Sequence, residues 1–494
     1  MQPLLVGDVL SLAAHRSPKR VAASFGDTEL RFAELETDAQ RLTRALAGQG
    51  LTVGDRIVWC GSTTISAIPL WFAAARIGVA FIPLNPAATK SEVNGILGRI
   101  DARLVIGDEV SAGITSISEL HRDASLTGVG QPNIDETSTH VVFFTSGSSD
   151  VPKGVELSHR ALRLRMMIDQ TQAPNGPTLC MFPHFHTAGW YGPMTAWANG
   201  DEVVYVERAD AESILEAIHR RRVTRLYAIP AVWRRILDAD LNNFDLECLR
   251  MCDTGTSATS AALLDEIAQR FPGTATSVTY GSTEAGGVCR LWPEDVHRKP
   301  GSVGPSAPGC EIRLEADKEL VVRSPFLFSG YFRDPVNTSA SLHNGWFRTG
   351  DLAECDEEGY YSIVGRSKEI IRTGGESVAP VEIDQILAGM PGVVDIAVAG
   401  VPDVAWGEVI TAFAVLEPGA VVTLDDLRSR CAGTLARFKH PRRLEIRESL
   451  PRTGATRQIQ RSLLVQSVID QNGGEPSTMI PVASGPSTER ESDQ

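Results

Sequence analysis

The chain has 494 residues, of which 43% are hydrophobic and 22% are charged, and this length is typical of about two to four globular domains. Its formal net charge of -14 disfavours partners such as nucleic acids or anionic membranes, because both surfaces would repel it. Any polyanionic ligand therefore needs a local basic pocket.

The cysteine pattern and the apolar runs indicate the compartment. Eight cysteines are scattered singly, without a CxxC pair or a zinc-ligand spacing, which is typical of reduced thiols. No charged leader with an apolar core opens the sequence, and no run of about 18 apolar residues could span a bilayer. We therefore expect a cytoplasmic protein without a membrane span.

Helical stretches and short apolar runs alternate along the first 130 residues and again at 201–280, as in an α/β protein. A helix is predicted at 32–48. Strands are predicted at 55–60, 78–84, 202–206, 225–229 and 276–280. A large, layered α/β body follows from this alternation.

The pattern changes after residue 300, where short strands are separated by Gly and Pro turns. Strands are predicted at 311–314, 319–323 and 360–364, which indicates a small β subdomain. A strand-helix-strand pattern at 380–388, 394–401 and 409–416 indicates a separate small α+β domain. Residues 472–494 are rich in Gly, Ser, Pro, Thr and Glu, and we expect a disordered tail there.

A loop suited to phosphate follows the apolar run 141–144. Its candidate binding residues are Thr145, Ser146, Gly147, Ser148, Ser149 and Lys153. Backbone N–H groups of such a loop can surround phosphate oxygens while the lysine adds a positive charge. The segment is not a Walker A motif, so that, taken alone, a Ser/Gly-rich surface turn is the alternative.

Three further segments follow in a fixed order: YGSTE at 280–284, GWFRTGD at 345–351, and GRSKE at 365–369 with GGE at 374–376. Together with the loop, they closely resemble the adenylate-forming superfamily of acyl-CoA synthetases, peptide-synthetase adenylation domains and firefly luciferases, over about residues 5–465. The resemblance implies an α/β fold in which residues 1–367 form two layered α/β subdomains and a small β-barrel subdomain. A small, mobile α+β domain would follow at 368–468, and a tail at 469–494.

The resemblance also implies a role for each matched residue in binding the AMP moiety of an acyl-adenylate. Tyr280 would stack on adenine, Thr283 would bond the phosphate, and Glu284 would hold a Mg²⁺ ion when ATP is used. Asp351 would accept both ribose hydroxyls, and Arg366 would reach the ribose. Taken singly, each has a structural alternative, such as a core aromatic, a helix cap or a surface ion pair.

Other matched residues concern the acyl group and the thiol. His186 matches a position that gates the incoming thiol, and it stands where peptide synthetases carry an aspartate for an α-amino group, so amino acids are not expected as substrates. Trp190, Gly255 and Thr256 would line the acyl pocket. Lys368 matches the hinge about which the small domain rotates between two half-reactions. The loop of Gly374, Gly375 and Glu376 would border the pantetheine tunnel of coenzyme A.

Two departures from the family pattern concern ATP. The last motif of the family carries a lysine that bridges the carboxylate and the α-phosphate, and in the segment 450–461 Gln458 stands where that lysine should precede isoleucine. Asp150 replaces a glycine of the phosphate loop and adds negative charge there. Both changes weaken the use of ATP, whereas the residues matched to AMP are present.

These observations predict an enzyme that transfers the acyl group of preformed acyl-AMP to coenzyme A and adenylates poorly, so that a separate adenylating enzyme would supply its substrate. One alternative is a full two-step synthetase using ATP and Mg²⁺, in which Arg457 or Lys439 replaces the missing charge. Another is a non-catalytic adenylate-binding protein. A carrier-protein thiol in place of free coenzyme A stays open.

Overall fold

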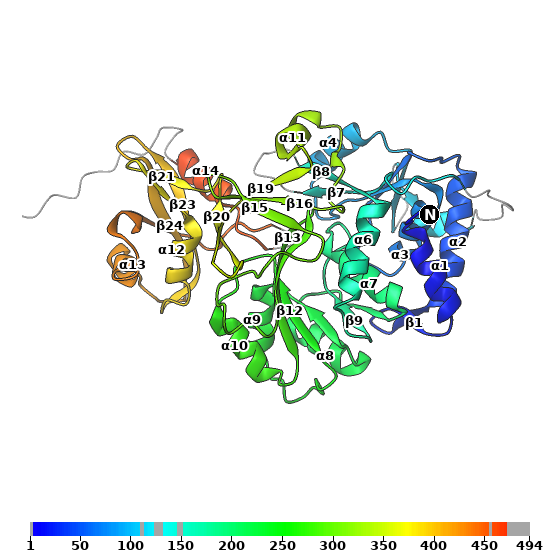
Figure 1. Ribbon diagram of the computed structural model, residues 1–494, viewed down its shortest axis with the longest axis horizontal. Coiled ribbons are helices and arrows are strands. Elements are labelled where there is room, and N and C mark those ends of the chain that lie inside the picture. Colours follow the sequence, from blue (N-terminus) through cyan, green and yellow to red (C-terminus); the bar gives the residue numbers. More distant parts are fainter. Residues whose placement is uncertain (1–2, 109–112, 123–131, 146–151, 454–456, 472–494) are drawn as a thin grey trace, which may run out of the picture. The chain divides into compact units, whose positions relative to one another are not determined.

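The computed structural model describes residues 3–108, 113–122, 132–145, 152–453 and 457–471 (Figure 1). The chain divides into two compact units. The first contains the chain up to Thr349 together with Ala353–Ile363, and the second contains Gly350–Leu352 together with the chain from Val364 onward. The segment 472–494 of the predicted tail lies outside the described residues.

A seven-stranded sheet in the first unit has the order β17-β8-β7-β4-β3-β5-β6. Its strands are β3 (Arg56–Trp59), β4 (Ala80–Pro83), β5 (Leu104–Gly107), β6 (Thr115–Ser116), β7 (Thr139–Thr145), β8 (Lys153–Ser158) and β17 (Gly330–Tyr331). Strands β3 to β7 are parallel, whereas β8 is antiparallel to both β7 and β17. The parallel strands therefore present their carboxyl ends, where ligands bind in α/β sheets, along one edge.

An eight-stranded sheet in the same unit has the order β14-β13-β12-β11-β9-β10-β1-β2. Its strands are β1 (Val21–Phe25), β2 (Thr28–Arg31), β9 (Thr178–Cys180), β10 (Val203–Tyr205), β11 (Arg225–Tyr227), β12 (Met251–Gly255), β13 (Ala275–Ser282) and β14 (Gly286–Leu291). The six central strands are parallel, and the edge strands β2 and β14 are antiparallel to their neighbours.

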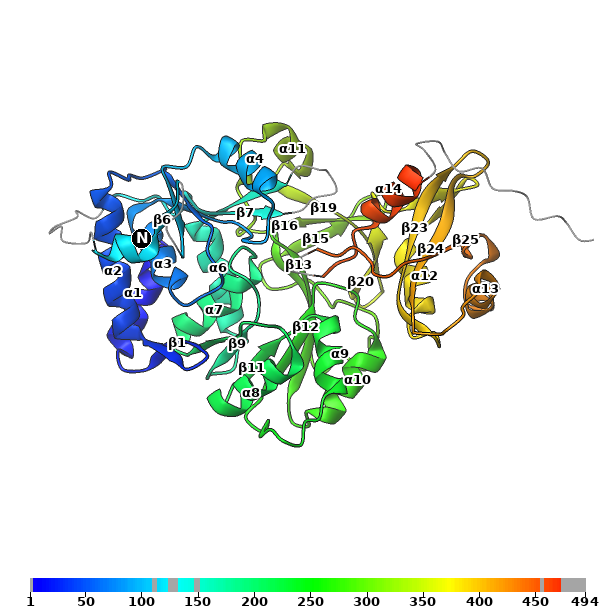
Figure 2. The ribbon, with the colours of Figure 1, turned by 180° about the vertical axis from the view of Figure 1, so that it is seen from behind.

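Helices cover both sheets and fill the space between them (Figures 1 and 2). They are α1 (Gly7–Arg16), α2 (Phe32–Gly48), α3 (Ala67–Ile77), α4 (Lys90–Ile100), α5 (Ile117–Arg122), α6 (His159–Gln170), α7 (Ala188–Asn199), α8 (Ala211–Arg221), α9 (Pro230–Asp238) and α10 (Ala261–Arg270). Helix α6 contacts β8, α7 contacts β9 and β10, and the two helices pack on each other. These two helices therefore connect the layers of one hydrophobic core.

The composition of α3 explains why it lies inside that core. All of its residues except Arg76 are apolar, and all except Arg76 are buried. A helix that is apolar all round has no face to present to water. Its Trp71 stacks on Trp190 of α7 with ring centroids 3.9 Å apart, which ties the first layer to the helices between the sheets.

A five-stranded sheet follows, with β15 (Glu311–Leu314), β16 (Glu319–Arg323), β18 (Leu342–His343), β19 (Trp346–Cys355) and β20 (Tyr361–Arg366). The short helix α11 (Pro335–Ser341) precedes β18. The boundary between the two units runs through strands β19 and β20, because Gly350–Leu352 and the chain from Val364 onward belong to the second unit.

The second unit is a small α+β domain. Its strands are β21 (Ile371–Thr373), β22 (Glu376–Val378), β23 (Val393–Asp403), β24 (Gly407–Leu416) and β25 (Arg443–Ile446). Its helices are α12 (Pro380–Leu387), α13 (Leu424–Cys431), the short 3₁₀ helix η1 (Arg437–Lys439) and α14 (Arg461–Gln471). Two hydrophobic clusters lie on the two faces of the β23–β24 hairpin and give this unit its own core.

The predicted α/β architecture with a small second domain is confirmed, and most individual elements agree with the expectations. The strand-helix-strand order predicted at 380–388, 394–401 and 409–416 is wrong for its first two segments. The first is helix α12, which Pro380 opens at its first position, and the second is strand β23, whose β-branched residues pair with β24. The helix predicted at 32–48 is α2 with the same bounds, and the strands predicted at 311–314 and 319–323 are β15 and β16. No helix in the part of the chain that the structure describes is long and apolar enough to cross a membrane.

Candidate functional site

The two ends of the predicted phosphate loop lie side by side. Thr145 ends β7 and Lys153 begins β8, and the two residues are opposite each other in the antiparallel pair. The Thr145 hydroxyl donates to the carbonyl of Lys153 at 3.4 Å. The predicted residues Ser146, Gly147, Ser148 and Ser149, and Asp150 with them, lie outside the described residues.

A shallow cavity of about 290 Å³ opens beside the start of β8. It is lined by Arg99, Phe144, Pro152, Lys153, Gly154, Phe332, Arg333 and Asp334. Three cationic side chains and one carboxylate therefore surround a space next to the loop. An excess of positive charge of this kind suits an anionic group on a protein whose net charge is -14.

Lys153 is linked to Glu284 through an aromatic side chain. Its Nζ lies 4.6 Å from the centroid of the Tyr331 ring, a cation–π contact. The Tyr331 hydroxyl donates to Oε1 of Glu284 at 3.0 Å. Burial, with the nearby Glu284 carboxylate, raises the pKa of Tyr331, so the phenol keeps its proton and stays a donor. Lys153 and Glu284, predicted to serve the same phosphates, thus belong to one contact network.

Glu284 and Thr283 sit in the turn between β13 and β14. The buried guanidinium of Arg165, from α6, donates to the Thr283 carbonyl at 3.0 Å and to the Glu284 carbonyl at 2.8 Å. The Ser282 hydroxyl caps the turn by accepting from the N–H of Ala285 at 3.1 Å. Tyr280, at the end of β13, is half-buried and packs against the main core.

His186 lies between β9 and α7 and is half-buried. The N–H of Ala188 donates to its Nδ1 at 3.2 Å, so that in the neutral ring Nε2 carries the proton. Burial lowers the pKa of His186 to about 4, and the ring is therefore neutral at pH 7. Trp190, two residues into the following helix, is 1% exposed and donates from Nε1 to the carbonyl of His184 at 2.7 Å. The structure thus places Trp190 in the core.

Gly255 ends β12 and Thr256 follows it, at the carboxyl edge of the eight-stranded sheet. A Cβ on Gly255 would lie 2.1 Å from the carbonyl oxygen of Thr279, so only glycine fits there. Thr256 has a φ of +72°, a strained conformation for a β-branched residue. Its hydroxyl shares a 2.9 Å hydrogen bond with Tyr227, whose ring lies 5.6 Å from that of Phe182. Tyr227 is a neighbour of the predicted acyl pocket that the sequence did not reveal.

In the second unit, Asp351 and Arg366 form an ion pair, with Nε to Oδ1 at 3.1 Å. The Arg366 side chain is 54% exposed, whereas Asp351 is largely buried. Lys368 is exposed in the turn directly after β20, where the N–H of Ser367 donates to the Gly350 carbonyl at 2.9 Å. The two residues predicted to contact the ribose are therefore in contact with each other.

Gly374 and Gly375 form the turn between β21 and β22, with φ values of +59° and +86° that favour glycine. The N–H of Gly374 donates to the Trp406 carbonyl at 2.9 Å, and a Cβ on Gly374 would lie 2.9 Å from the Trp406 ring. Glu376 begins β22 and is exposed. This turn is therefore held against an indole.

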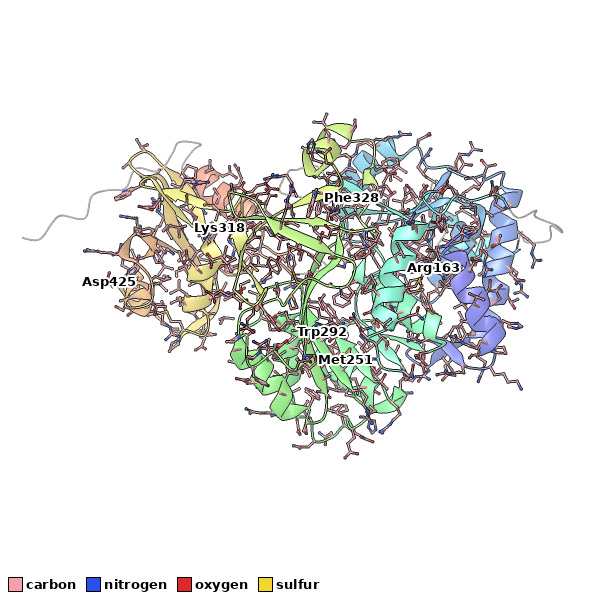
Figure 3. All side chains as sticks on the ribbon, viewed as in Figure 1. Arg163, Met251, Trp292, Lys318, Phe328 and Asp425 are labelled. Atoms are coloured by element: carbon pink, nitrogen blue, oxygen red, sulfur yellow. The ribbon has the colours of Figure 1, made fainter. Side chains whose placement is uncertain are left out.

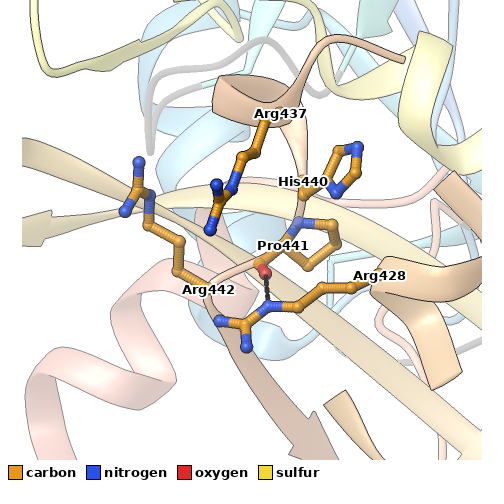
Figure 4. Close-up of a pocket in the computed structure, with 5 residues that line it drawn as sticks. All are labelled: Arg428, Arg437, His440, Pro441 and Arg442. Atoms are coloured by element: carbon orange, nitrogen blue, oxygen red, sulfur yellow. Dashed lines mark hydrogen bonds between the residues drawn. The ribbon is translucent and has the colours of Figure 1, made fainter. Parts of the chain in front are cut away.

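The same indole contacts Arg442, one of the residues that line a basic pocket of about 230 Å³, shown in Figure 4. The pocket is lined by Arg428, Arg437, His440, Pro441 and Arg442. The Arg442 guanidinium lies 3.6 Å from the centroid of the Trp406 ring. Burial and the two neighbouring arginines lower the pKa of Arg442, which reflects repulsion between like charges. An anion in this pocket would relieve that repulsion.

Gln458 is half-buried in a loop that folds back on itself. Its N–H donates to the Thr453 hydroxyl at 3.0 Å, and its carbonyl accepts from the N–H of Thr453 at 2.8 Å. Arg452 fixes the loop by pairing with both oxygens of Asp395 at 2.8 and 2.9 Å. Arg457, which precedes Gln458, is exposed. The backbone around Gln458 is therefore well supported within its unit.

Glu284 is the residue predicted to hold a Mg²⁺ ion when ATP is used. Within the described ranges, no group of three or more His, Cys, Asp or Glu side chains could hold a metal. A single carboxylate, Glu284, is nevertheless compatible with Mg²⁺, which usually binds one or two carboxylates and completes its shell with substrate phosphates and water.

The structure therefore brings together Lys153, Glu284 and Thr283 in the first unit, and Asp351 with Arg366 in the second. Sequence reasoning missed Arg165 and Tyr331. Neither was distinguishable, because Arg165 is one of several arginines at 160–165 and Tyr331 lies far along the chain from both of its partners. The arginines of the basic pocket could have been found from the sequence, because residues 428–443 have a local excess of positive charge in an otherwise acidic chain.

Comparison with known proteins extends these observations. Residues 10–332 match the AMP-binding enzyme family, and residues 382–457 match the AMP-binding enzyme C-terminal domain. Indoleacetate–CoA ligase of Aromatoleum aromaticum is 30% identical over 475 residues, which cover 88% of this chain and 93% of that protein. Feruloyl-CoA synthase of an Amycolatopsis species is 30% identical over 467 residues, covering 90% of this chain and 95% of the relative.

Solved structures show the same similarity in three dimensions. The o-succinylbenzoate CoA synthetase of Bacillus subtilis, in complex with its acyl-adenylate intermediate, superposes with a TM-score of 0.84 at 26% identity, covering 94% of this chain and 98% of that one. ATP-bound MatB from Rhodopseudomonas palustris superposes with a TM-score of 0.87 at 26% identity, covering 95% of this chain and all of that one.

Proposed function

The chain belongs to the AMP-binding enzyme family, in its acyl-CoA ligase branch, and from this premise we propose that it acts mainly in the second half-reaction. In that step the sulfur of coenzyme A attacks the carbonyl carbon of an acyl-adenylate. The bond between that carbon and the phosphate oxygen breaks, AMP leaves, and the thiol proton passes to solvent. The first half-reaction, which joins a carboxylate to the α-phosphate of ATP, is slow in this chain.

One observation carries the proposal: Gln458 is uncharged at the position of the family's bridging lysine. Adenylation brings two anions together, a carboxylate and a phosphate, and a cation between them stabilises the transition state. Attack of a thiol on an existing mixed anhydride needs no such bridge. Gln458 is bonded to Thr453 and Arg452 pairs with Asp395, so that the described residues on both sides of this segment are held in place.

The residues assigned to AMP support the proposal because they keep their chemistry. Tyr280 is half-buried at a strand end, Thr283 and Glu284 are fixed through their carbonyls, and Asp351 pairs with Arg366. We assign adenine to Tyr280, and the phosphate, with Mg²⁺ when present, to Thr283 and Glu284. We assign the ribose to Asp351 and Arg366. Lys153 and the loop before it would hold phosphate oxygens.

For coenzyme A we propose the basic pocket of the second unit as the site of its phosphate groups. The pocket adjoins Trp406, which also packs against the turn of Gly374 and Gly375, and that turn is the proposed border of the pantetheine tunnel. The substitution Arg442→Ala would raise the KM for coenzyme A about tenfold, since a hydrogen bond to a charged group contributes about 1.5 kcal/mol or more. The KM for the acyl-adenylate would stay the same.

The test measures both half-reactions with pure protein. Acid with ATP and Mg²⁺ is assayed for pyrophosphate, with and without coenzyme A, and in parallel a synthetic acyl-AMP is assayed with coenzyme A for thioester. The acids start with indoleacetate and ferulate, which the relatives' names suggest. We expect thioester from acyl-AMP and little pyrophosphate from ATP. Rapid release of pyrophosphate would overturn the division of labour, and a lack of thioester from every acyl-AMP would favour a purely adenylate-binding protein.

If adenylation is slow, a separate adenylating enzyme would supply the acyl-adenylate. We propose a cytoplasmic setting for both, which the eight free thiols fit. An acceptor thiol on a carrier protein is tested by replacing coenzyme A with a phosphopantetheinylated carrier in the same assay.

The second candidate is a complete two-step synthetase in which another cation replaces the lysine. Lys439 is already paired with Glu382, at 2.7 Å, which lowers its value as a substitute. Arg457 is exposed beside Gln458 and is therefore the better substitute. In this case Arg457→Ala would abolish pyrophosphate release while leaving thioester formation from acyl-AMP intact.

A further inference from the structure

The guanidinium of Arg165 is a buried cation whose described partners are backbone carbonyls. It donates to the carbonyl of Thr283 at 3.0 Å, to that of Glu284 at 2.8 Å, and to that of Phe326 at 3.1 Å. The side chain is 3% exposed, and burial lowers its pKa to about 10, which still leaves it charged at pH 7. Among the described residues no carboxylate pairs with it within 4.0 Å. A buried charge of this kind persists only where its surroundings satisfy it.

The local backbone is shaped around this guanidinium. Gly286, at the far end of the turn, has a φ of +72°, and a Cβ there would lie 2.8 Å from Nε of Arg165. The carbonyl of Glu284 also accepts from the N–H of Phe328 at 2.8 Å, and Phe328 is labelled in Figure 3. Because their carbonyls are tied to Arg165, the peptide units of the turn have a fixed orientation.

The carboxylate of Glu284 is held by a different residue. The Tyr331 hydroxyl donates to Oε1 at 3.0 Å, and the same ring carries the ammonium of Lys153 on its face, 4.6 Å from the centroid. The backbone of Glu284 thus depends on Arg165 and its side chain on Tyr331. Both supports belong to the first unit, and neither lies in a segment matched to the family motifs.

We propose that Arg165 and Tyr331 are positioning residues for the phosphate of the adenylate, with Arg165 setting the turn of Thr283 and Glu284 and Tyr331 aiming the Glu284 carboxylate. Arg165 polarises the carbonyls that it binds and adds a fixed positive charge behind the turn. The flat, forked guanidinium reaches three carbonyls at once, which a lysine ammonium on a single stem does not reproduce. The inference rests on the proposed function, because it concerns how that function's nucleotide is held.

The experiment compares Arg165→Met, Arg165→Lys and Tyr331→Phe with the unaltered protein. The affinity for AMP is measured by calorimetry in the presence of Mg²⁺, and KM values for synthetic indoleacetyl-AMP and for coenzyme A are measured separately. We expect Arg165→Met to raise the Kd for AMP and the KM for the adenylate by about tenfold or more, because charged hydrogen bonds are lost. The KM for coenzyme A should change by less than about twofold, since the turn would not touch the thiol. Arg165→Lys should recover only part of the loss.

Arg163→Met is the matched control, from the same helix (Figure 3). Arg163 is also partly buried and donates to one backbone carbonyl, that of Leu5, at 3.0 Å. It should lower the melting temperature and leave the AMP affinity unchanged. If Arg165→Met does not fold, Tyr331→Phe decides the matter, because it removes a single oxygen and should weaken AMP binding about threefold.

The inference would be overturned if Arg165→Met folds and binds AMP with normal affinity. It would also be overturned if Arg165→Met is unfolded and Tyr331→Phe binds AMP with normal affinity. An equal loss of affinity in Arg163→Met would overturn it too. The proposed function fails separately, when the unaltered protein binds AMP but forms no thioester from any acyl-AMP with coenzyme A. In that case the effects on AMP affinity would still test the positioning roles.

Discussion

The substitution Gln458→Lys restores the family's charge at one position, and we expect it to speed adenylation. The backbone N–H and C=O of Gln458 are both bonded to Thr453, so the substitution exchanges one side-chain head group on an unchanged loop.

The magnitude follows from the burial of the side chain. A unit charge about 4 Å from an anion contributes about 4 kcal/mol at an effective dielectric constant of about 20. Because the side chain at position 458 is half-buried, solvent screening reduces this contribution to roughly 2 kcal/mol. An effect of that size corresponds to about a 30-fold increase in the rate of pyrophosphate release from acid and ATP.

The assay couples pyrophosphate release to a colour reaction under saturating ATP and Mg²⁺. Gln460→Lys is the control, because it adds the same charge two residues away in the same loop. An unchanged rate in Gln458→Lys, with thioester formation from acyl-AMP intact, would refute the idea that the missing charge limits adenylation. An equal gain in Gln460→Lys would show that only the general electrostatic potential matters.

Two other predictions concern stability. Gly374→Ala should destabilise the second unit by about 1–2 kcal/mol because its backbone is left-handed, and further because the new Cβ would lie 2.9 Å from the Trp406 ring. Gly375→Ala should show only the backbone effect, because its Cβ would meet nothing within 4 Å. Equal urea midpoints for the two variants would contradict this prediction. Burial lowers the pKa of His159 to about 4 and that of His184 to about 3. The neutral rings therefore contribute their full stability above about pH 6.5. Below that pH the unfolded chain binds protons first, so the free energy of unfolding should fall by about 1.4 kcal/mol per histidine and pH unit as the pH drops toward the folded pKa values. A urea midpoint that stays constant between pH 7 and pH 5 would contradict this.

Much of the fold was predictable because periodicity follows directly from burial. The helix at 32–48 repeats its apolar residues once per turn, and its buried positions in the structure are Phe32, Leu35, Ala39, Leu42, Ala45 and Leu46. Strands such as β11 and β10 are short apolar runs between turn residues, and here the prediction was right to within two residues at each end. Both signals are local and need no knowledge of partners.

The candidate site was predictable only where its residues are adjacent in sequence. The turn at 280–284 and the glycine turn at 374–375 are visible as short patterns, because a tight backbone restricts residue types locally. The contacts of Arg165 with Thr283 and of Tyr331 with Lys153 join segments more than 100 residues apart, and no spacing rule encodes them. Tertiary packing alone creates such contacts.

The connectivity of the eight-stranded sheet bears on how the chain emerges from the ribosome. Strand β1 lies near the amino end, yet its parallel neighbour β10 begins only at Val203. The nascent chain must therefore carry the β1–β2 hairpin with one open edge while about 170 further residues are made, and open edges invite pairing with other chains. We expect a transient need for a holding chaperone over this interval, and a smaller need in a circular permutant that begins at Phe32, in which β10 is made before the β1–β2 hairpin.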